Sequence, residues 1–207
     1  MKPLLPLLLV PLLLTGCDMA GNPFASAEKP AAEYRPQDAG TIDHALCLLG
    51  FVSVPVTGVN PGHDLVEATI NGVTGSFVLD TGANLTVINA SQAERFGLSA
   101  RGSGLPGIGT ARFAGNTANA RPVAVDSFTM GDVTVRQRRV LVADLGSLLA
   151  SLGQISGRDI AGLIGQDVMN EHRAIIDVNR PMLYVMAEDR EPAPVPAENC
   201  TGVAAAA

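Results

Sequence analysis

The chain has 207 residues, of which 47% are hydrophobic, enough to bury the core of one ordinary domain or two very small ones. Its formal net charge of -6 argues against general attraction to nucleic acid, and no nucleic-acid partner is expected. The three histidines are scattered and no metal-ligand spacing of cysteines or histidines occurs, so we expect neither a metal nor a cofactor.

The N-terminal segment, residues 1–16, has the features of an export signal. Lys2 precedes the apolar stretch LLPLLLVPLLL, which is too short to span a membrane. The next residues, Leu14-Thr15-Gly16-Cys17, resemble the lipobox of bacterial lipoproteins, which implies that Cys17 is lipidated and becomes the mature N-terminus. The sorting rule linked to that motif, applied to Asp18, implies a periplasm-facing lipoprotein of the bacterial cell envelope, held at the inner membrane. The alternative is an ordinary cleavable signal with a chance cysteine.

The composition then divides the chain into three parts. Residues 17–45 are rich in Ala, Pro and charged residues and are expected to be a flexible tether, and 188–207 are expected to be a flexible tail. The folded domain is therefore expected at 46–187. Cys47 and Cys200 flank it, and in an oxidising compartment a disulfide between them would tie the N-terminal arm to the tail.

Within the domain, short apolar runs separated by turn residues indicate an all-β protein. Strands at 65–70 and 73–80 flank Asn71-Gly72, the strongest short hairpin signal, because both turn residues need a positive φ. The other predicted elements, in chain order, are a strand at 85–88, a short helix at 90–98, long strands at 121–131 and 133–144, a helical turn or flap at 145–152, a strand at 161–165, a short helix at 166–172, and a closing hairpin of 174–178 with 182–185.

Two motifs in this order resemble the retropepsin-like aspartic proteases, including their bacterial members. The first is VLDTGANLTVI, which contains Asp80-Thr81-Gly82-Ala83 between apolar flanks, and the second, about eighty residues later, is DIAGLIGQDVMNEHRAIIDVNRPMLYV. The resemblance covers roughly residues 51–186. It implies an all-β, retropepsin-like half-barrel with one or two short helices, and an aspartic endopeptidase that hydrolyses polypeptides.

The same resemblance implies the site residues. Asp80 is the implied catalytic residue, and its implied supporting residues are Thr81, Gly82, Ala83, Leu163, Ile164 and Gly165. A flap close to the substrate is implied at Gly107, Ile108 and Gly109. A flexible surface loop is the alternative for this glycine-rich segment.

The chemistry of such a site requires a second acid. Hydrolysis without a metal or a protein nucleophile needs one ionised acid, to deprotonate water, and one protonated acid, to protonate the carbonyl oxygen. Two carboxyls about 3 Å apart meet this need, because repulsion between like charges makes them share one proton. The chain has one Asp-Thr-Gly, and the other candidate acids, Asp159, Asp167 and Asp177, are not followed by Thr/Ser-Gly. The partner acid is therefore expected from Asp80 of a second copy in a two-fold homodimer.

Two other interpretations of Asp80 stay open. The fold could serve a non-catalytic periplasmic lipoprotein that binds extended peptides as an added strand. Alternatively, Asp80 could be only a turn residue that accepts a hydrogen bond from its own backbone.

Overall fold

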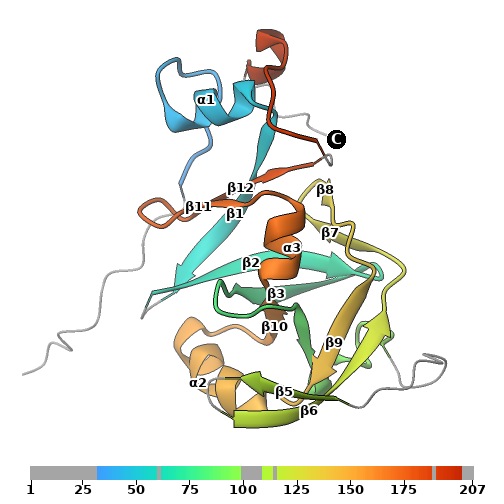
Figure 1. Cartoon of the computed structure of the whole chain (residues 1–207). Coiled ribbons are helices and arrows are strands. Elements are labelled where there is room, and N and C mark those ends of the chain that lie inside the picture. Colours follow the sequence, from blue (N-terminus) through green and yellow to red (C-terminus); the bar gives the residue numbers. More distant parts are fainter. Residues whose placement is uncertain (1–31, 60–61, 99–108, 114–115, 188–189, 202–207) are drawn as a thin grey trace, which may run out of the picture.

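The computed structural model describes residues 32–59, 62–98, 109–113, 116–187 and 190–201 (Figure 1). Residues 32–98 contain the helix α1 (Ile42–Leu48), the strands β1 (Phe51–Val59), β2 (His63–Ile70), β3 (Val73–Leu79) and β4 (Val87–Asn89), and the 3-10 helix η1 (Ala90–Gln92). The described residues after them contain β5 (Gly109–Phe113), β6 (Asn116–Ala124), β7 (Phe128–Met130), β8 (Val133–Thr134), β9 (Arg139–Ala143), α2 (Gly146–Ser156), β10 (Ile160–Ile164), α3 (Gln166–Glu171), β11 (Ile175–Asp177), β12 (Met182–Met186) and η2 (Ala197–Cys200).

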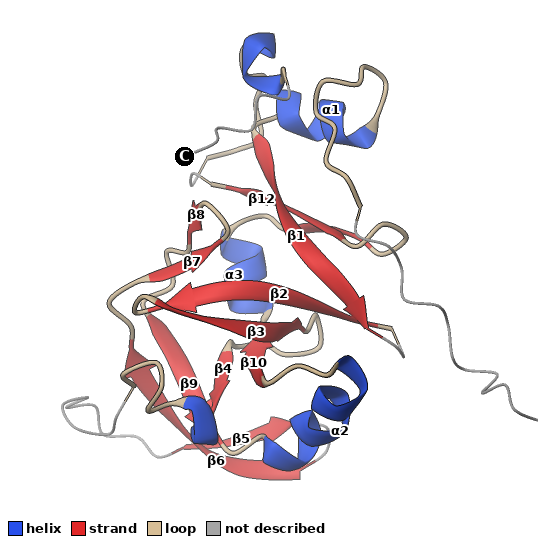
Figure 2. Ribbon diagram, turned by 180° about the vertical axis from the view of Figure 1, so that it is seen from behind, coloured by secondary structure: helices blue, strands red, loops and turns tan. Residues whose placement is uncertain are grey.

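All twelve strands of the described chain belong to one sheet. Its order is β11-β12-β1-β2-β3-β10-β4-β9-β6-β5, and β7 joins it through β2 and carries β8. Figures 1 and 2 show α2 at the same end of the molecule as the β5–β6 hairpin, whereas α1 and η2 lie at the opposite end. The strand-rich architecture with few helices confirms the predicted fold class.

The β2–β3 hairpin forms at the predicted turn. Ile70 pairs with Val73, and the two residues between them, Asn71 and Gly72, have φ values of 50° and 82°. These left-handed conformations are the ones that a two-residue turn with right-handed strand twist requires. The strand β3 begins after this turn and ends at Leu79, immediately before Asp80.

The strand β10 lies between β3, to which it is parallel, and β4, to which it is antiparallel. The loop that joins β3 to β4 must therefore cross the end of β10. Glycines in β10 and directly after it allow the two backbones to lie close together. A Cβ on Gly162 would lie 2.1 Å from the carbonyl oxygen of Val87, and one on Gly165 would lie 2.5 Å from the carbonyl carbon of Leu85. Side chains cannot be accommodated at either position without moving backbone.

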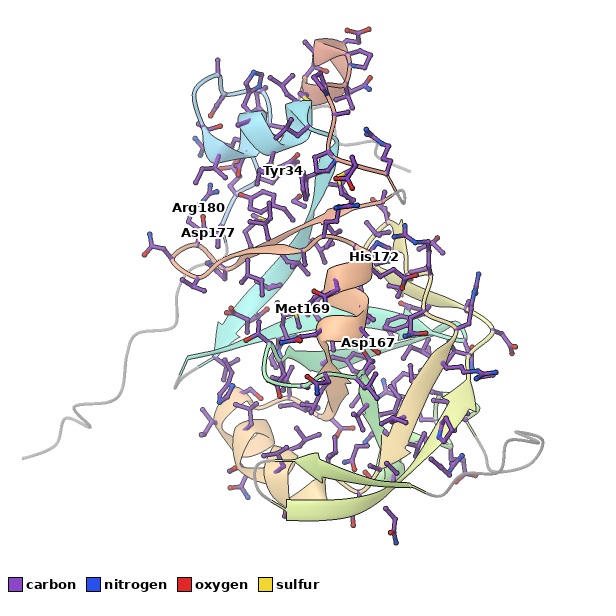
Figure 3. All side chains as sticks on the ribbon, viewed as in Figure 1. Tyr34, Asp167, Met169, His172, Asp177 and Arg180 are labelled. Atoms are coloured by element: carbon purple, nitrogen blue, oxygen red, sulfur yellow. A yellow bond between two sulfur atoms is a disulfide. The ribbon has the colours of Figure 1, made fainter. Side chains whose placement is uncertain are left out.

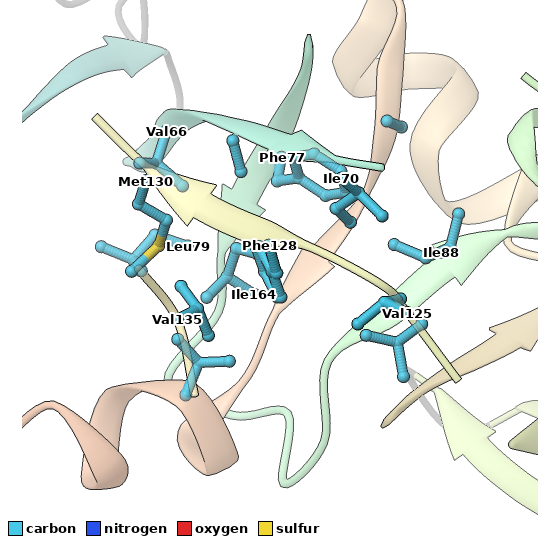
Figure 4. Close-up of a cluster of buried hydrophobic side chains, with 14 of the residues drawn as sticks. Val66, Ile70, Phe77, Leu79, Ile88, Val125, Phe128, Met130, Val135 and Ile164 are labelled. Carbon is cyan, nitrogen blue, oxygen red and sulfur yellow. The ribbon is translucent and has the colours of Figure 1, made fainter. Parts of the chain in front are cut away.

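Two hydrophobic clusters hold this arrangement. The larger cluster, drawn in Figure 4, packs the buried faces of the sheet together, and its labelled members are Val66, Ile70, Phe77, Leu79, Ile88, Val125, Phe128, Met130, Val135 and Ile164. The second lies beneath α2 and joins Leu145, Leu149 and Leu152 to Val78 and Leu163. Because β3 and β10 contribute to both clusters, the end of β3 is held from both faces of the sheet.

Three predicted elements differ from the observed ones. The helix expected at 90–98 is only the 3-10 helix η1 followed by turns, and Gly97 has a left-handed φ of 67° that a continuing helix cannot contain. The long strand at 121–131 is interrupted between β6 and β7, where the Asn71 carboxamide oxygen accepts hydrogen bonds from Asp126 N and Ser127 N. The strand at 133–144 is likewise divided into β8 and β9. The segment at 145–152, for which a helical turn or a flap was expected, belongs to α2.

Ordered elements lie on both sides of the predicted boundaries 46 and 187. A disulfide joins Cys47 in α1 to Cys200 in η2, 153 residues apart. Asp43 of α1 is buried and forms an ion pair of 2.9 Å with Arg180, which also contacts Asp177 at 2.9 Å. Figure 3 shows Arg180 and Asp177 together near Tyr34, at the turn between β11 and β12.

Candidate active site

Asp80 follows β3 directly and is partly buried. Its backbone N–H donates to the carbonyl oxygen of Ile164 at 3.0 Å, so its position is fixed by the end of β10. Its Oδ1 accepts a hydrogen bond of 2.8 Å from the N–H of Gly82, and a Cβ on Gly82 would lie 3.1 Å from the same oxygen. This contact is an Asx-turn, and it also fits a catalytic carboxylate approached by a backbone amide. The surroundings of Asp80 must therefore separate the two interpretations.

The residues after Asp80 are tied to the start of α3. The side-chain amide of Gln166 donates to the carbonyl oxygen of Thr81 at 2.6 Å, and its backbone N–H donates to that of Ala83 at 2.8 Å. The N–H of Asp167 donates to the carbonyl oxygen of Asn84 at 3.2 Å. The loop is thus held along its length rather than only at its ends.

Hydrogen bonds between the buried Thr86 and the partly buried Asp167 complete this attachment. Thr86 is fully buried; its N–H donates to Asp167 Oδ2 at 3.0 Å and its hydroxyl donates to Asp167 Oδ1 at 2.8 Å. The Thr86 hydroxyl in turn accepts from the N–H of Gly165 at 3.1 Å. Asp167 was excluded above as a second catalytic acid, and its positioning role was missed. The sequence signal was a single threonine in an apolar run and, within the second motif, an acid two residues after Gly165.

The structure brings the two motifs together. Ile164 and Gly165 bond to Asp80 and Thr86 as described, and Leu163 lines the same pocket as Asp80. Of the three predicted flap residues, Gly109 lies in the described part of the chain. Gly109 is the first residue of β5 and pairs with Ala120, at the end of the β5–β6 hairpin away from its turn. Gly107, Ile108 and Cys17 lie outside the described residues.

A pocket of about 370 Å³ opens beside Asp80. Residues of β3, β10 and α2 form most of its wall, and the lining residues are His63, Val78, Leu79, Asp80, Leu148, Leu149, Ser151, Leu152, Ile155 and Leu163. A concave, mainly apolar site with a few polar groups is typical of ligand-binding pockets. The aspartate of the first motif therefore lies at a pocket that could receive part of a substrate.

The described residues contain no cluster of three or more His, Cys, Asp or Glu side chains that could hold a metal ion. None of the helices in the described part of the chain has the length and apolarity that crossing a membrane requires.

Comparison with known proteins identifies the class. The model of the family described as aspartyl protease matches residues 66–168, which run from β2 into α3 and include the first motif and the beginning of the second. This region of the chain is therefore similar to the aspartyl proteases, and the predicted resemblance to the retropepsin-like aspartic protease family is confirmed for it.

Three of the solved structures that are similar to this chain are proteases or protease-like domains. They are a retropepsin-like aspartic protease from Rickettsia conorii (20% identity, TM-score 0.43, covering 66% of this chain and 90% of that one), the EIAV protease complexed with the inhibitor HBY-793 (19% identity, TM-score 0.35, covering 54% and 88%), and the retroviral protease-like domain of Ddi1 from Leishmania major (19% identity, TM-score 0.36, covering 64% and 94%). No curated protein sequence matches the chain significantly.

Proposed function

We propose that the protein is an aspartic endopeptidase whose active site forms when Asp80 of one copy meets Asp80 of a second copy. The observation that supports it most is the placement of Asp80: it directly follows β3 and lines an apolar pocket, and its loop is hydrogen-bonded to α3 from Thr81 to Thr86. A residue that served only as a turn would not need a loop fixed so extensively. Pre-organised groups lower the cost of reaching the transition state.

The proposed reaction uses one proton shared by the two carboxyls. The ionised carboxylate removes a proton from a water molecule, whose oxygen attacks the peptide carbonyl carbon, while the protonated carboxyl gives its proton to the carbonyl oxygen. When the tetrahedral intermediate collapses, the C–N bond breaks: one carboxyl gives its proton to the leaving amine, and the other, ionised carboxylate takes the proton of one hydroxyl, which restores the shared proton of the dyad. The N–H of Gly82, 2.8 Å from Asp80 Oδ1, would hold the carboxylate in place throughout.

The cellular setting is part of the same proposal. Lipidation of Cys17 would anchor the protein in the bacterial cell envelope, facing the periplasm and held at the inner membrane. Confinement to a surface raises the effective concentration of the chains and would favour the homodimer. The substrates would be polypeptides, and neither a metal nor another cofactor would take part.

One observation favours a second candidate function, a lipoprotein that binds peptides without cutting them. The contact between Gly82 and Asp80 also satisfies a plain turn, and the pocket could hold a side chain without any chemistry. A comparison of Asp80→Asn with the unchanged residue separates the candidates, because asparagine keeps the size of the side chain but cannot share a proton.

The experiment uses the exported chain with Cys17→Ser, an unstructured protein as substrate, and pepstatin as inhibitor. Cleavage should occur, should be blocked by pepstatin, and should disappear with Asp80→Asn, whereas Asp132→Asn on the exposed surface should have no effect. Equal cleavage by the wild type and Asp80→Asn would disprove the catalytic role.

A subunit-mixing experiment tests the shared dyad. When the wild type is mixed with increasing Asp80→Asn protein, mixed dimers contain one acid only, so activity should fall below that of the wild type diluted with buffer. Activity that follows simple dilution, together with monomers in sedimentation, would exclude the dimeric site.

A further inference from the structure

We infer that the disulfide between Cys47 and Cys200 is a one-way latch, which completes the active site only after the chain has entered an oxidising compartment. The thiol form of the chain folds its sheet but holds the loop of Asp80 loosely, and closure of the disulfide fixes that loop. The inference rests on the proposed function in two respects, the export of the chain and the cleavage that serves as one readout. It concerns two segments that lie outside both sequence motifs.

The C-terminal segment 190–201 depends on Cys200 for its attachment. Within this segment Cys200 is the one buried residue, at 2% exposed. Two backbone N–H groups of the segment, those of Ala193 and Val195, donate to carbonyl oxygens at the C-terminal end of α1, at 3.3 and 2.8 Å. A segment that buries so little surface cannot offset the entropy lost when it is ordered. The disulfide is therefore what holds it against α1.

The helix α1 depends on Cys47 in the same way. It has seven residues, a length at which a helix is marginal without tertiary contacts. Its buried residues are Asp43, which forms the ion pair with Arg180, and Cys47, which is 8% exposed. Opening the disulfide would therefore remove one of the two buried attachments of α1.

The arm before α1 and the helix itself cover one face of the paired strands β1 and β12. They pack there on a further cluster of buried side chains, Phe51, Met182, Tyr184 and Met186. The rings of Tyr34 and Tyr184 are in edge contact, with their centroids 6.4 Å apart. If α1 moved away, this apolar face would lose its cover and β12 would be held less firmly.

The end of β12 is joined to the end of α3. The N–H of Met186 donates to the carbonyl oxygen of His172, and the Nδ1–H of His172 donates to that of Met186, both at 2.8 Å and both buried. Figure 3 shows His172 and Asp167 at opposite ends of α3, which is six residues long. Asp167 in turn holds Thr86. The disulfide is thus connected to the loop of Asp80 through α1, β12 and α3.

The direction of the latch follows from thiol chemistry and from burial. Two thiols form the link by exchange with another disulfide, which accepts their two electrons and two protons and becomes a pair of thiols. Such oxidants act in exported compartments, whereas cytosolic thiols stay reduced. Once the link is closed, the burial of both cysteines leaves an attacking thiolate little access to the sulfur atoms. The site would be incomplete before export and would stay complete after it.

The test starts from the full chain with Cys17→Ser, unfolded and refolded in dithiothreitol so that Cys47 and Cys200 are thiols. One half is then oxidised with glutathione disulfide. Hydrogen exchange at the backbone amide of Thr86 should be about tenfold slower after oxidation, and cleavage of an unstructured protein should be about tenfold faster. Equal exchange in the two forms would overturn the latch. A thiol form without strand structure by circular dichroism would also overturn it, because the link would then hold the whole fold.

Two variants separate the latch from a general loss of stability. Cys47→Ser/Cys200→Ser should behave like the thiol form and should not respond to glutathione disulfide. Asn71→Gly, at the turn between β2 and β3, also removes hydrogen bonds but keeps the disulfide. It should keep the slow exchange at Thr86 and the full cleavage. If Asn71→Gly lost as much of both as the cysteine variant did, with both folded by circular dichroism, the latch would be wrong.

The substitution His172→Leu tests the connection through β12. It removes the hydrogen bond from Nδ1 to Met186, so oxidation should slow exchange at Thr86 by a smaller factor than in the wild type. An undiminished factor would show that the connection does not pass through His172.

The two readouts separate this inference from the proposed function. If oxidation slows exchange at Thr86 but neither form cleaves the substrate, the latch stands and the catalytic proposal fails. If the thiol form cleaves as fast as the oxidised form, catalysis stands and the latch is wrong.

Discussion

Thr86 and Asp167 are joined by two hydrogen bonds, 3.0 Å from the threonine N–H and 2.8 Å from its hydroxyl, although they lie 81 residues apart in the chain. The pair connects the loop that carries Asp80 to the first turn of α3, which Figure 3 shows with Asp167 labelled. Thr86 is fully buried with Asp167 in place, and removal of the carboxylate would take away the protein acceptor of both its N–H and its hydroxyl.

Replacing Asp167 should therefore destabilise the loop and the fold together. Asp167→Ala should lower the free energy of unfolding by about 1–3 kcal/mol for the donors left unpaired, and Asp167→Asn should lower it less, because its oxygen can still accept from Thr86. Urea denaturation measures the difference. The control is Asp132→Ala on the surface, expected within about 0.5 kcal/mol of wild type; an equal effect of Asp132→Ala and Asp167→Ala would contradict the positioning role.

The close approach of β10 to β4 predicts which of two glycine substitutions destabilises the protein more. Gly162→Ala would place a Cβ 2.1 Å from the Val87 carbonyl oxygen, so backbone must move, whereas Gly75→Ala would meet the side chain of Phe96 at 2.8 Å. Since backbone of a paired strand yields less than a side chain, Gly162→Ala should cost several kcal/mol, at the high end for single substitutions, and Gly75→Ala about 1–3 kcal/mol. Thermal unfolding of both variants checks the order, and a smaller loss for Gly162→Ala would refute it.

The sequence predicted correctly those elements of the fold that depend on residues close together in the chain. Asn71-Gly72 requires a particular turn wherever it stands, and the strand before Asp80 and the helix after Gly165 were found at nearly their predicted bounds. The long strand at 121–131 was misjudged because its interruption depends on Asn71, which lies more than fifty residues earlier in the chain.

The partners within the site could not be predicted in this way. Thr86 and Asp167 were visible as residues, but nothing near either one in the sequence shows that they meet. The same holds for α2, whose role depends on where its apolar face is packed, and for α1, whose buried Asp43 meets Arg180 across 137 residues. The sequence predicted Asp80 and its motif, whereas tertiary packing decides what surrounds them.

Two substitutions of Asn71 separate the contribution of its positive φ to stability from that of its side-chain hydrogen bonds. Besides bonding Asp126 and Ser127, its amide donates to the carbonyl oxygen of Phe96 at 2.9 Å. Asn71→Gly keeps the positive φ but loses these bonds, and should cost about 1–3 kcal/mol. Asn71→Ala also strains the turn and should cost about 1 kcal/mol more. Urea denaturation of both variants gives the two contributions, and equal stability of Asn71→Ala and Asn71→Gly would rule out the conformational one.

The disulfide between Cys47 and Cys200 should contribute strongly to stability because it closes a loop of 153 residues. Loss of such a link typically costs about 2–4 kcal/mol, since the unfolded chain gains freedom. The double variant Cys47→Ser/Cys200→Ser should therefore melt at a lower temperature than the wild type. A reducing agent should lower the melting temperature of the wild type only, and an equal response of both proteins would show that the link does not stabilise the fold.

The Asp43 network predicts how stability depends on pH. Burial alone would raise the pKa of the Asp43 carboxyl, but hydrogen bonds from Arg180, Tyr184 and the Arg35 backbone outweigh burial and hold it below its ordinary value of 3.8. A carboxyl with a lowered pKa in the folded state stabilises the protein above about pH 4, and this stabilisation is lost as the pH falls through the folded value. Stability of the wild type should therefore decrease steeply as the pH falls below about 4.

Asp43→Asn tests that assignment. The variant should be less stable at pH 7, by up to the roughly 3–5 kcal/mol that removing one partner of a buried ion pair costs, yet it should lose less stability between pH 5 and pH 3 because asparagine does not titrate. Some dependence should remain, since the backbone N–H of Arg180 also lowers the pKa of Asp177. Urea denaturation at pH 7, 5 and 3 measures both effects, with Asp132→Asn as the surface control. If the wild type and Asp43→Asn lost the same stability on acidification, the ion pair with Arg180 would not be what holds α1 on the β11–β12 hairpin at neutral pH.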